Sequence, residues 1–185
     1  MFANRFSLLI LSGLFLSTGS FALSQGGSPS APPTLKSILL EELKSTHNEA
    51  GWFVPVNTAI AGLTPEQATW KDSSDNHSII QLVNHLVFWN QQYLAKFNGE
   101  KPAAFDGDNK ETFANLDKGA WDSRVKELDK VLSAWEKAIE QADDAKLAKW
   151  ASNIARISTH NAYHTGQIIY IRKMKGNWDA EKGVK

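Results

Sequence analysis

The sequence predicts an all-α protein built as a four-helix bundle, and three features favour that class. Four segments carry apolar residues at the three- and four-residue spacing of a core-facing helix. No segment shows the sustained period-two alternation of a half-buried strand, and 185 residues suit a single domain. A long polar connection after the second segment lets helices two and three run parallel, so we expect an up-down-down-up bundle.

The composition excludes several classes of function. Lys and Arg number 20, Asp and Glu also number 20, and cysteine is absent. A formal net charge of +0 argues against nucleic-acid binding, which calls for a basic excess. Without cysteine there is no disulfide, thiolate nucleophile or Cys-ligated metal. Any metal would therefore be held by histidine, carboxylate or water.

The first 24 residues are typical of a secretory signal peptide. Arg5 is the only charge before an apolar run at residues 6–16, and Ala22-Leu23-Ser24 offers a small-residue cleavage site. The run is shorter than the ~20 apolar residues that a membrane-spanning helix needs. We therefore expect export to the periplasm or the exterior, with no stable membrane insertion after cleavage.

The folded domain is expected at residues 34–180. Residues 25–33 (QGGSPSAPP) are rich in Gly, Ser and Pro and are expected to form a flexible linker. The first helix is predicted over Leu35–Ala61. Pro55 should kink or break it, because proline removes one intrahelical hydrogen bond.

The second helix is predicted to begin at Asp75 or Asn76, which are favourable N-caps. It should end at Asn98-Gly99, since glycine commonly terminates helices. Residues 99–119 form the long polar connection that follows. Connections of this length inside a compact domain are usually functional or poorly ordered.

The last two helices complete the predicted bundle. The third is expected over residues 120–142, where apolar residues recur every three or four positions. The fourth is expected to start after Ser152-Asn153, a capping pair, and to continue to Lys175, with Gly176 at its C-terminal stop.

His160 and His164 form an H-x-x-x-H pair on the predicted fourth helix. Residues four apart lie on one face of a helix, about 6 Å apart, which lets two imidazoles bind one divalent metal. Ile157, Ile168 and Ile171 share this side, so the pair should point toward the core. From these residues alone three interpretations stay open: a metal site, core histidines satisfied by hydrogen bonds, and a solvated surface pair.

A third metal ligand has to come from another helix. His85 lies between Leu82 and Leu86 in the apolar stripe of the second helix and is the first candidate, although a lone histidine there is more often a hydrogen-bonded core residue. His77 lies two turns earlier, at the helix start, and is expected to be solvated or to cap the helix. His47 flanks the apolar stripe of the first helix and is the reserve candidate.

Three segments resemble the DinB/YfiT-like superfamily. Residues 78–86 (SIIQLVNHL), followed by Trp89, resemble the second helix of that family. Residues 160–168 (HNAYHTGQI) resemble its fourth helix, where H-x-x-x-H-x-G-Q-I precedes an arginine such as Arg172. Residues 68–71 (ATWK), before the second helix, are also similar.

The resemblance covers residues 35 to about 178 and implies an up-down-down-up four-helix bundle. It also implies a metal held by one histidine of the second helix and two of the fourth, here His85, His160 and His164. We expect the ion to be Zn²⁺ or Ni²⁺. Members of known activity are mostly transferases or isomerases that use a low-molecular-weight thiol, and others are described as metal-dependent hydrolases.

Three hypotheses for the function are compatible with these residues. The first is a metal-dependent enzyme, a hydrolase or a thiol-dependent transferase, whose three histidines leave an open position for water or substrate. The second is a non-catalytic envelope module that binds a metal or a small ligand, and the third is a metal-free structural bundle. The expected partner is a small-molecule substrate or ligand, and a homodimer is one alternative for the assembly.

The identity of a general base does not follow from the sequence. Asn161 follows His160 where the H-E-x-x-H metalloprotease motif has a glutamate, so that motif is excluded. Tyr163 and Asn161 are expected to point away from the histidine face, since successive residues of a helix turn by ~100°. Export would also separate the protein from the reduced cytosolic thiols that a thiol transferase needs.

Aromatic residues are the remaining candidates for the pocket. Trp89, one helical turn after His85, is expected to line the pocket beside the metal, with His47 as a second candidate lining residue. In the long connection Phe105 and Phe113 could cover the pocket mouth. The alternative is a solvated and mobile connection.

Overall fold

A computed structural model describes residues 32–72 and 75–183 of the chain. Within these residues the protein contains six α-helices, three short 3-10 helices and no strand, so the predicted all-α class is confirmed. No helix in this described part is long and apolar enough to cross a membrane. The predicted signal peptide and the linker up to residue 31 lie outside the described residues.

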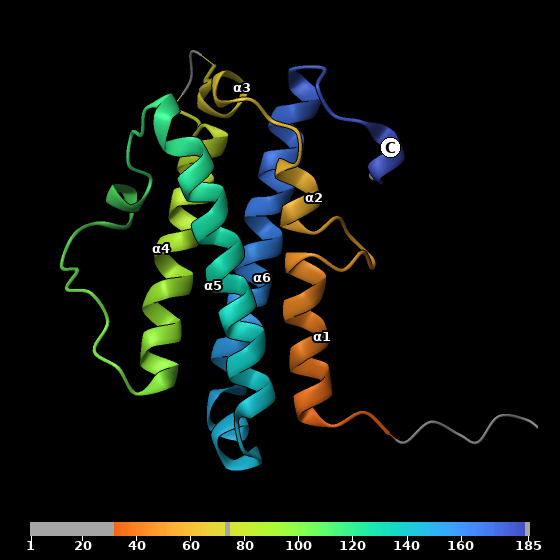
Figure 1. Cartoon of the computed structure of the whole chain (residues 1–185), viewed down its shortest axis with the longest axis vertical. Coiled ribbons are helices and arrows are strands. Elements are labelled where there is room, and N and C mark those ends of the chain that lie inside the picture. The colour runs from red at the N-terminus through yellow and green to blue at the C-terminus, as the bar shows by residue number, and fades with distance from the viewer. Residues whose placement is uncertain (1–31, 73–74, 184–185) are drawn as a thin grey trace, which may run out of the picture. The chain divides into compact units, whose positions relative to one another are not determined.

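The single first helix predicted over residues 35–61 is wrong, because two separate helices occupy this region. α1 covers Leu35–His47 and α2 covers Val56–Ile60 (Figure 1). Pro55 is the N-cap of α2 in an extended conformation, with φ −70° and ψ 157°. Proline disfavours helical geometry in the residue before it, so the chain cannot continue one helix through this point.

A further short helix, α3 at Pro65–Thr69, precedes the predicted second helix. That second helix is α4 at Ile79–Asn98. Its N-cap is Ser78 rather than Asp75 or Asn76, because the Ser78 hydroxyl accepts from the backbone N–H of Gln81 while the Gln81 amide oxygen accepts from the Ser78 N–H. α4 ends as predicted, at Gly99 with a left-handed φ of 78°.

The last two helices are α5 at Trp121–Gln141 and α6 at Asp144–Met174. The predicted start of the fourth helix after Ser152-Asn153 is wrong, since α6 begins just after Asp143. The Asp143 carboxylate accepts from the backbone N–H of Lys146 at 2.8 Å and thereby caps the helix. Ser152 and Asn153 lie inside α6 and do not cap it.

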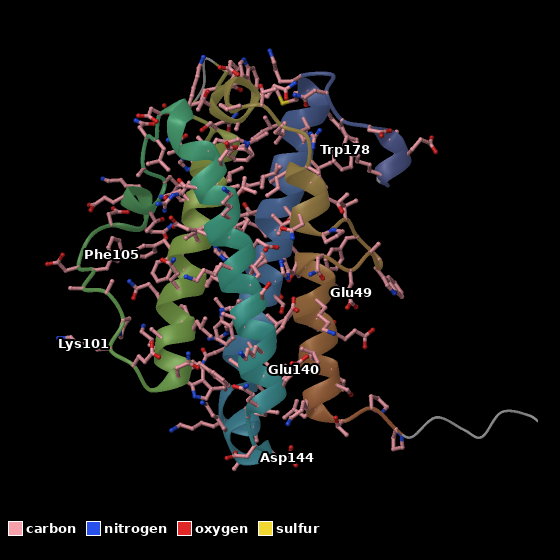
Figure 2. All side chains as sticks on the ribbon, viewed as in Figure 1. Glu49, Lys101, Phe105, Glu140, Asp144 and Trp178 are labelled. Carbon is pink, nitrogen blue, oxygen red and sulfur yellow. The ribbon has the colours of Figure 1, made fainter. Side chains whose placement is uncertain are left out.

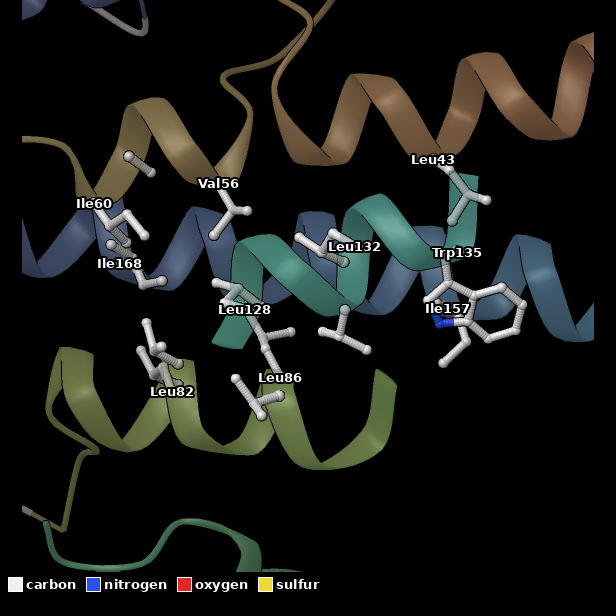
Figure 3. Close-up of a cluster of buried hydrophobic side chains, with 14 of the residues drawn as sticks. Leu43, Val56, Ile60, Leu82, Leu86, Leu128, Leu132, Trp135, Ile157 and Ile168 are labelled. Carbon is white, nitrogen blue, oxygen red and sulfur yellow. The ribbon is translucent and has the colours of Figure 1, made fainter. Parts of the chain in front are cut away.

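The four long helices pack around a common apolar core. α4 and α1 each contact both α5 and α6, while α2 lies against α6 and α3 against α4. Burial of such side chains stabilises the fold by about 1.5–3 kcal/mol each. The residues labelled in Figure 3 are Leu43, Val56, Ile60, Leu82, Leu86, Leu128, Leu132, Trp135, Ile157 and Ile168.

The connection between α4 and α5 is held against α4 by amide side chains. Gln81 donates to the carbonyl of Phe113 at 3.0 Å, Asn84 donates to the carbonyl of Thr112 at 2.8 Å, and Gln92 donates to the carbonyl of Ala103 at 3.0 Å. The connection contains two 3-10 helices, η1 at Asn109–Thr112 and η2 at Lys118–Ala120. Its first part runs alongside α4 (Figure 1).

Aromatic rings add to this attachment. Phe105 of the connection packs edge-on against Phe88 of α4, with ring centroids 4.7 Å apart, and against Trp89 at 6.2 Å. Figure 2 labels Phe105 on the stretch of the connection that passes α4. These hydrogen bonds and ring contacts attach the connection to α4 at particular residues, although most of residues 99–111 are exposed.

Candidate metal centre

Three histidines from two helices converge at one point. His85 of α4 has its Nε2 atom 3.0 Å from Nε2 of His160, and Nε2 of His164 lies 3.1 Å from the same atom. One nitrogen from each ring lies within 4.8 Å of the other two. Among the described residues this is the one group of three or more potential metal-ligating side chains gathered so closely.

Helix packing positions these side chains. His160 and His164 are one turn apart on α6, on a face that also buries Ile157 and Ile168. His85 lies on the core-facing side of α4, beside the buried Leu82 and Leu86. Because α4 packs against α6, the third imidazole is brought to the pair.

Hydrogen bonds at the outer ring nitrogens define the tautomers of two of these histidines. The Thr112 hydroxyl donates to the carbonyl of Asn109 at 2.6 Å, so its oxygen is left to accept from Nδ1–H of His85 at 2.5 Å. The Gln167 amide oxygen accepts from Nδ1–H of His164 at 2.6 Å. Both rings therefore direct an Nε2 lone pair toward His160.

This arrangement is not satisfied by hydrogen bonds among the three rings alone. Nε2 of His160 can carry one proton, and that proton cannot point at both His85 and His164. Nδ1 of His160 is itself buried without a hydrogen-bond partner. Tetrahedral zinc bound at about 2.0–2.1 Å would space its nitrogen ligands about 3.3 Å apart, close to the separations of 3.0 and 3.1 Å. The donor set and its spacing thus fit a divalent metal.

Burial keeps the three imidazoles neutral, which is the form that binds metal. Desolvation, assisted by the neighbouring rings of His164 and His160, lowers the pKa of His85 to about 3. Desolvation and the charge of His164 lower the pKa of His160 to about 4. The pKa of His164 is also lowered by burial, against the opposing effect of its hydrogen bond to Gln167.

The long connection supplies the support for His85. Asp108 caps η1 by accepting from the backbone N–H of Lys110, and this short helix presents Thr112 to the imidazole. The next residue, Phe113, stacks between two histidines, with ring centroids 3.9 Å from His85 and 3.8 Å from His77. His77 does not cap α4, whose N-cap is Ser78, and its half-buried ring packs on Phe113, so it is only partly solvated.

A cavity of about 510 Å³ opens beside the three histidines. This volume lies within the range of about 300–1,000 Å³ typical of small-molecule sites. Trp89 lines it, and the indole N–H of Trp89 donates to the Asn109 side chain at 3.0 Å. Besides Trp89 and the histidines, the lining residues are Tyr93, Asn109, Phe113, Asn153, Arg156, Ile157 and Tyr163.

Several of these lining residues were not expected from the sequence. Tyr163 lines the cavity with an exposed ring, contrary to the expectation that it points away from the histidines. Asn161 does point away, and its amide oxygen accepts from Asn90 of α4 at 2.8 Å. Asn153 and Arg156 precede His160 by about two turns and one turn, so helical spacing along α6 was the signal that could have found them.

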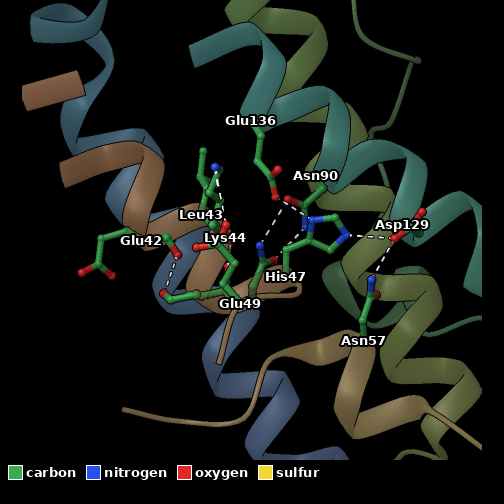
Figure 4. Close-up of polar contacts among 12 residues, drawn as sticks. Glu42, Leu43, Lys44, His47, Glu49, Asn57, Asn90, Asp129 and Glu136 are labelled. Atoms are coloured by element: carbon green, nitrogen blue, oxygen red, sulfur yellow. Dashed lines mark hydrogen bonds and ion pairs between the residues drawn. The ribbon is translucent and has the colours of Figure 1, made fainter. Parts of the chain in front are cut away.

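His47 does not line this cavity, so its selection as a lining or reserve ligand residue is wrong. Its ring is 1% exposed and lies between two carboxylates of α5, as Figure 4 shows. Nδ1 lies 2.6 Å from Glu136 and Nε2 lies 3.0 Å from Asp129, which also accepts from Asn57. Both ring nitrogens are thus engaged in joining α1 to α5.

Comparison with known proteins places the chain in a family. A family model described as the DinB superfamily matches residues 56–168, which is more than half of the chain and includes the three histidines. Neither the comparison with curated proteins nor that with solved structures gives a match. On the strength of the family match, this chain belongs to the DinB superfamily.

Proposed function

We propose that the protein is an exported metal-dependent enzyme, of the hydrolase or thiol-dependent transferase type, that acts on a small molecule. His85, His160 and His164 would hold a divalent ion, zinc or nickel. The observation that carries this proposal is the convergence of neutral ring nitrogens at a cavity of about 510 Å³. Buried imidazoles held in one tautomer are typical of a prepared metal site.

When bound, the divalent ion supplies Lewis-acid chemistry and lowers the pKa of a coordinated water or thiol. Thr112 and Gln167 hold the rings of His85 and His164 in the tautomer that presents Nε2. Phe113 and Trp89 line the cavity beside the histidines. Hydrolysis is favoured over thiol transfer if the protein is exported, because reduced thiols are scarce outside the cytosol.

A non-catalytic binding module is the second candidate. Among the described residues that line the cavity none is acidic, so a carboxylate general base is missing there. This observation favours binding without turnover. The two candidates share the metal site and differ only in activity.

The proposal includes the export of the chain and the order of its long helices. Cleavage near Ser24 should leave a mature N-terminus at or close to Gln25, which mass spectrometry of the native protein would detect. An intact Met1 in a cytosolic pool would contradict export. For α1, α4, α5 and α6 we propose the up-down-down-up order, which is supported by the contacts of α1 and α4 with the same two helices.

The test of function begins with the metal content of the purified mature protein, measured by mass spectrometry of the elements. We expect close to one divalent ion per chain, lost in His160→Ala and retained in His47→Ala. Ester, amide and thiol-transfer substrates are then screened with and without a chelator. Activity that the chelator removes supports an enzyme, and stoichiometric metal without activity supports the binding module. A wild-type protein that binds neither zinc nor nickel would refute both.

A further inference from the structure

Arg156 is a cation without a partner at the wall of the cavity. It lines the same cavity as the three histidines, and its side chain is exposed. Within the described part of the chain it makes no hydrogen bond and no ion pair. An arginine that stabilises a fold usually engages a carboxylate or carbonyl, as Arg172 does with the carbonyls of Ala59 and Ala61. Arg156 is therefore available to a ligand.

The described lining of the cavity carries one formal charge, and it is positive. Arg156 is the one formally charged side chain among the described lining residues, since the histidines are neutral. A divalent ion on the three histidines would add two positive charges to that of the guanidinium. A cavity lined in this way attracts an anion and disfavours a cation.

The spacing on α6 separates the two positive centres. Arg156 precedes His160 by four residues, which corresponds to about 6 Å along the helix axis. The two side chains lie on one face of the helix. A ligand of modest length can thus reach the histidines with one end and the guanidinium with the other.

Much of the remaining lining of the cavity is aromatic or aliphatic. Trp89 and Tyr93 of α4 line it, with ring centroids 6.2 Å apart, and Phe113 lines it from the connection. Ile157 of α6 adds an aliphatic surface. Such a wall binds the hydrocarbon body of a ligand, because burial of apolar area is favourable.

We propose that Arg156 is the substrate-anchoring residue and that the substrate is a small amphipathic acid. Its anionic group would pair with the guanidinium, its apolar or aromatic body would lie on Trp89 and Tyr93, and its reacting group would lie at the histidines. This inference deepens the proposed function and rests on it for the identity of the reacting end. The anionic group itself is recognised by Arg156, with or without a metal.

Calorimetric titration with 3-phenylpropanoate and its neutral analogue 3-phenylpropanamide tests the inference. The proteins are wild type, Arg156→Gln, Arg156→Lys, His160→Ala for the zinc titrations, and the control Lys149→Gln. Lys149→Gln removes an exposed cation from the same helix away from the cavity. Each is titrated after removal of metal by a chelator and again after addition of zinc. Circular dichroism confirms that the exposed substitutions leave the fold intact.

In the metal-free wild type we expect the acid to bind about tenfold more tightly than the amide, because its carboxylate can form a charge-assisted hydrogen bond with the guanidinium. Arg156→Gln should abolish this preference by weakening the acid alone. Arg156→Lys should retain part of it, and Lys149→Gln all of it. Equal binding of acid and amide by wild type, an unchanged preference in Arg156→Gln, or no binding of the acid to wild type would overturn the inference.

The zinc arm separates this inference from the proposed function. If zinc binds at the histidines, it should increase the affinity for the acid in wild type and in Arg156→Gln, but not in His160→Ala. If zinc does not change the affinity for the acid, but the preference for acid over amide still depends on Arg156, the metal site is contradicted. Arg156 then remains the residue that binds the anionic group.

Discussion

Replacing His85 by alanine should weaken metal binding, whereas replacing His47 by alanine should leave metal binding unchanged and lower the stability of the fold. Both histidines are buried, and each comes from the apolar side of a long helix. Only His85 has a ring nitrogen next to His160, at 3.0 Å. His47 instead joins α1 to Glu136 and Asp129 of α5. The pair of variants thus separates a metal ligand from a structural histidine.

The expected magnitudes follow from these contacts. Structural zinc sites with four ligands bind with about 10–16 kcal/mol, or about 2.5–4 kcal/mol per ligand, so His85→Ala should weaken zinc binding by about 10²–10³-fold. The metal-free variant should lose at most about 2–3 kcal/mol, since a modest cavity replaces an imidazole. His47→Ala should keep the metal affinity. It should cost about 2–4 kcal/mol of stability, because the partly buried Glu136 loses its partner while the more exposed Asp129 is rehydrated.

Two measurements on each variant test whether His85 is a metal ligand and His47 a structural residue. Competition with a chromophoric chelator gives the zinc affinity, and urea unfolding of the metal-free protein gives the free energy of unfolding. His164→Ala serves as a reference for the loss of another of the three proposed ligands. If His47→Ala loses zinc while His85→Ala keeps it, the assignment of ligands and the packing of α4 beside α6 are both refuted.

Three further predictions concern the support of the site, its protonation and the fold. Thr112→Val should weaken zinc binding by about 10–100-fold in the same competition assay, because His85 loses the acceptor that orients its ring, whereas Thr112→Ser should retain wild-type affinity. The folded-state pKa values of His85 and His160, about 3 and about 4, lie below the unfolded value of 6.5. Their contribution to the stability of the metal-free protein is therefore complete above pH 6.5 and is lost as the pH falls to about 4 for His160 and about 3 for His85. Urea unfolding across that pH range should show this decline in the free energy of unfolding, and a smaller decline for His85→Ala. If the free energy of unfolding falls equally with pH in both proteins, His85 does not have a lowered pKa in the folded state. Arg172→Leu should destabilise the protein by about 3–5 kcal/mol in urea, because the buried guanidinium holds carbonyls at the end of α2 and after α6, and a loss below about 1 kcal/mol would refute that role.

The sequence by itself determined the features that depend on near neighbours in the chain. Apolar spacing identified α4 and α5 within a few residues, and the glycine at position 99 marked the end of α4. The proximity of His160 and His164 follows from helical geometry alone, since residues four apart share a face. The H-x-x-x-H-x-G-Q-I motif, together with residues 78–86 and 68–71, indicated the family, which the match over residues 56–168 confirmed.

The predicted helix starts were wrong where more than one residue in the sequence could serve as the N-cap. Ser152-Asn153 and Asp143 both have the chemistry of an N-cap, and the caps at Asp75, Asn76 and Ser78 were likewise equivalent in sequence. Which one is used depends on where the apolar face of the helix first meets the core. The division of the first helix into α1 and α2 had a signal in Pro55, but the point where α1 ends did not.

Only the tertiary structure decided which histidines from different helices meet. His47 and His85 have similar surroundings in sequence, yet packing directs one to the carboxylates of α5 and the other to α6. The same holds for Thr112 and Phe113, which lie in a polar connection without helical periodicity and reach His85 because amides of α4 hold the backbone there. Contacts between residues far apart in the chain are set by the packing of whole helices. The physical reason is that periodicity specifies which face of a helix is buried but not which other helix that face will contact.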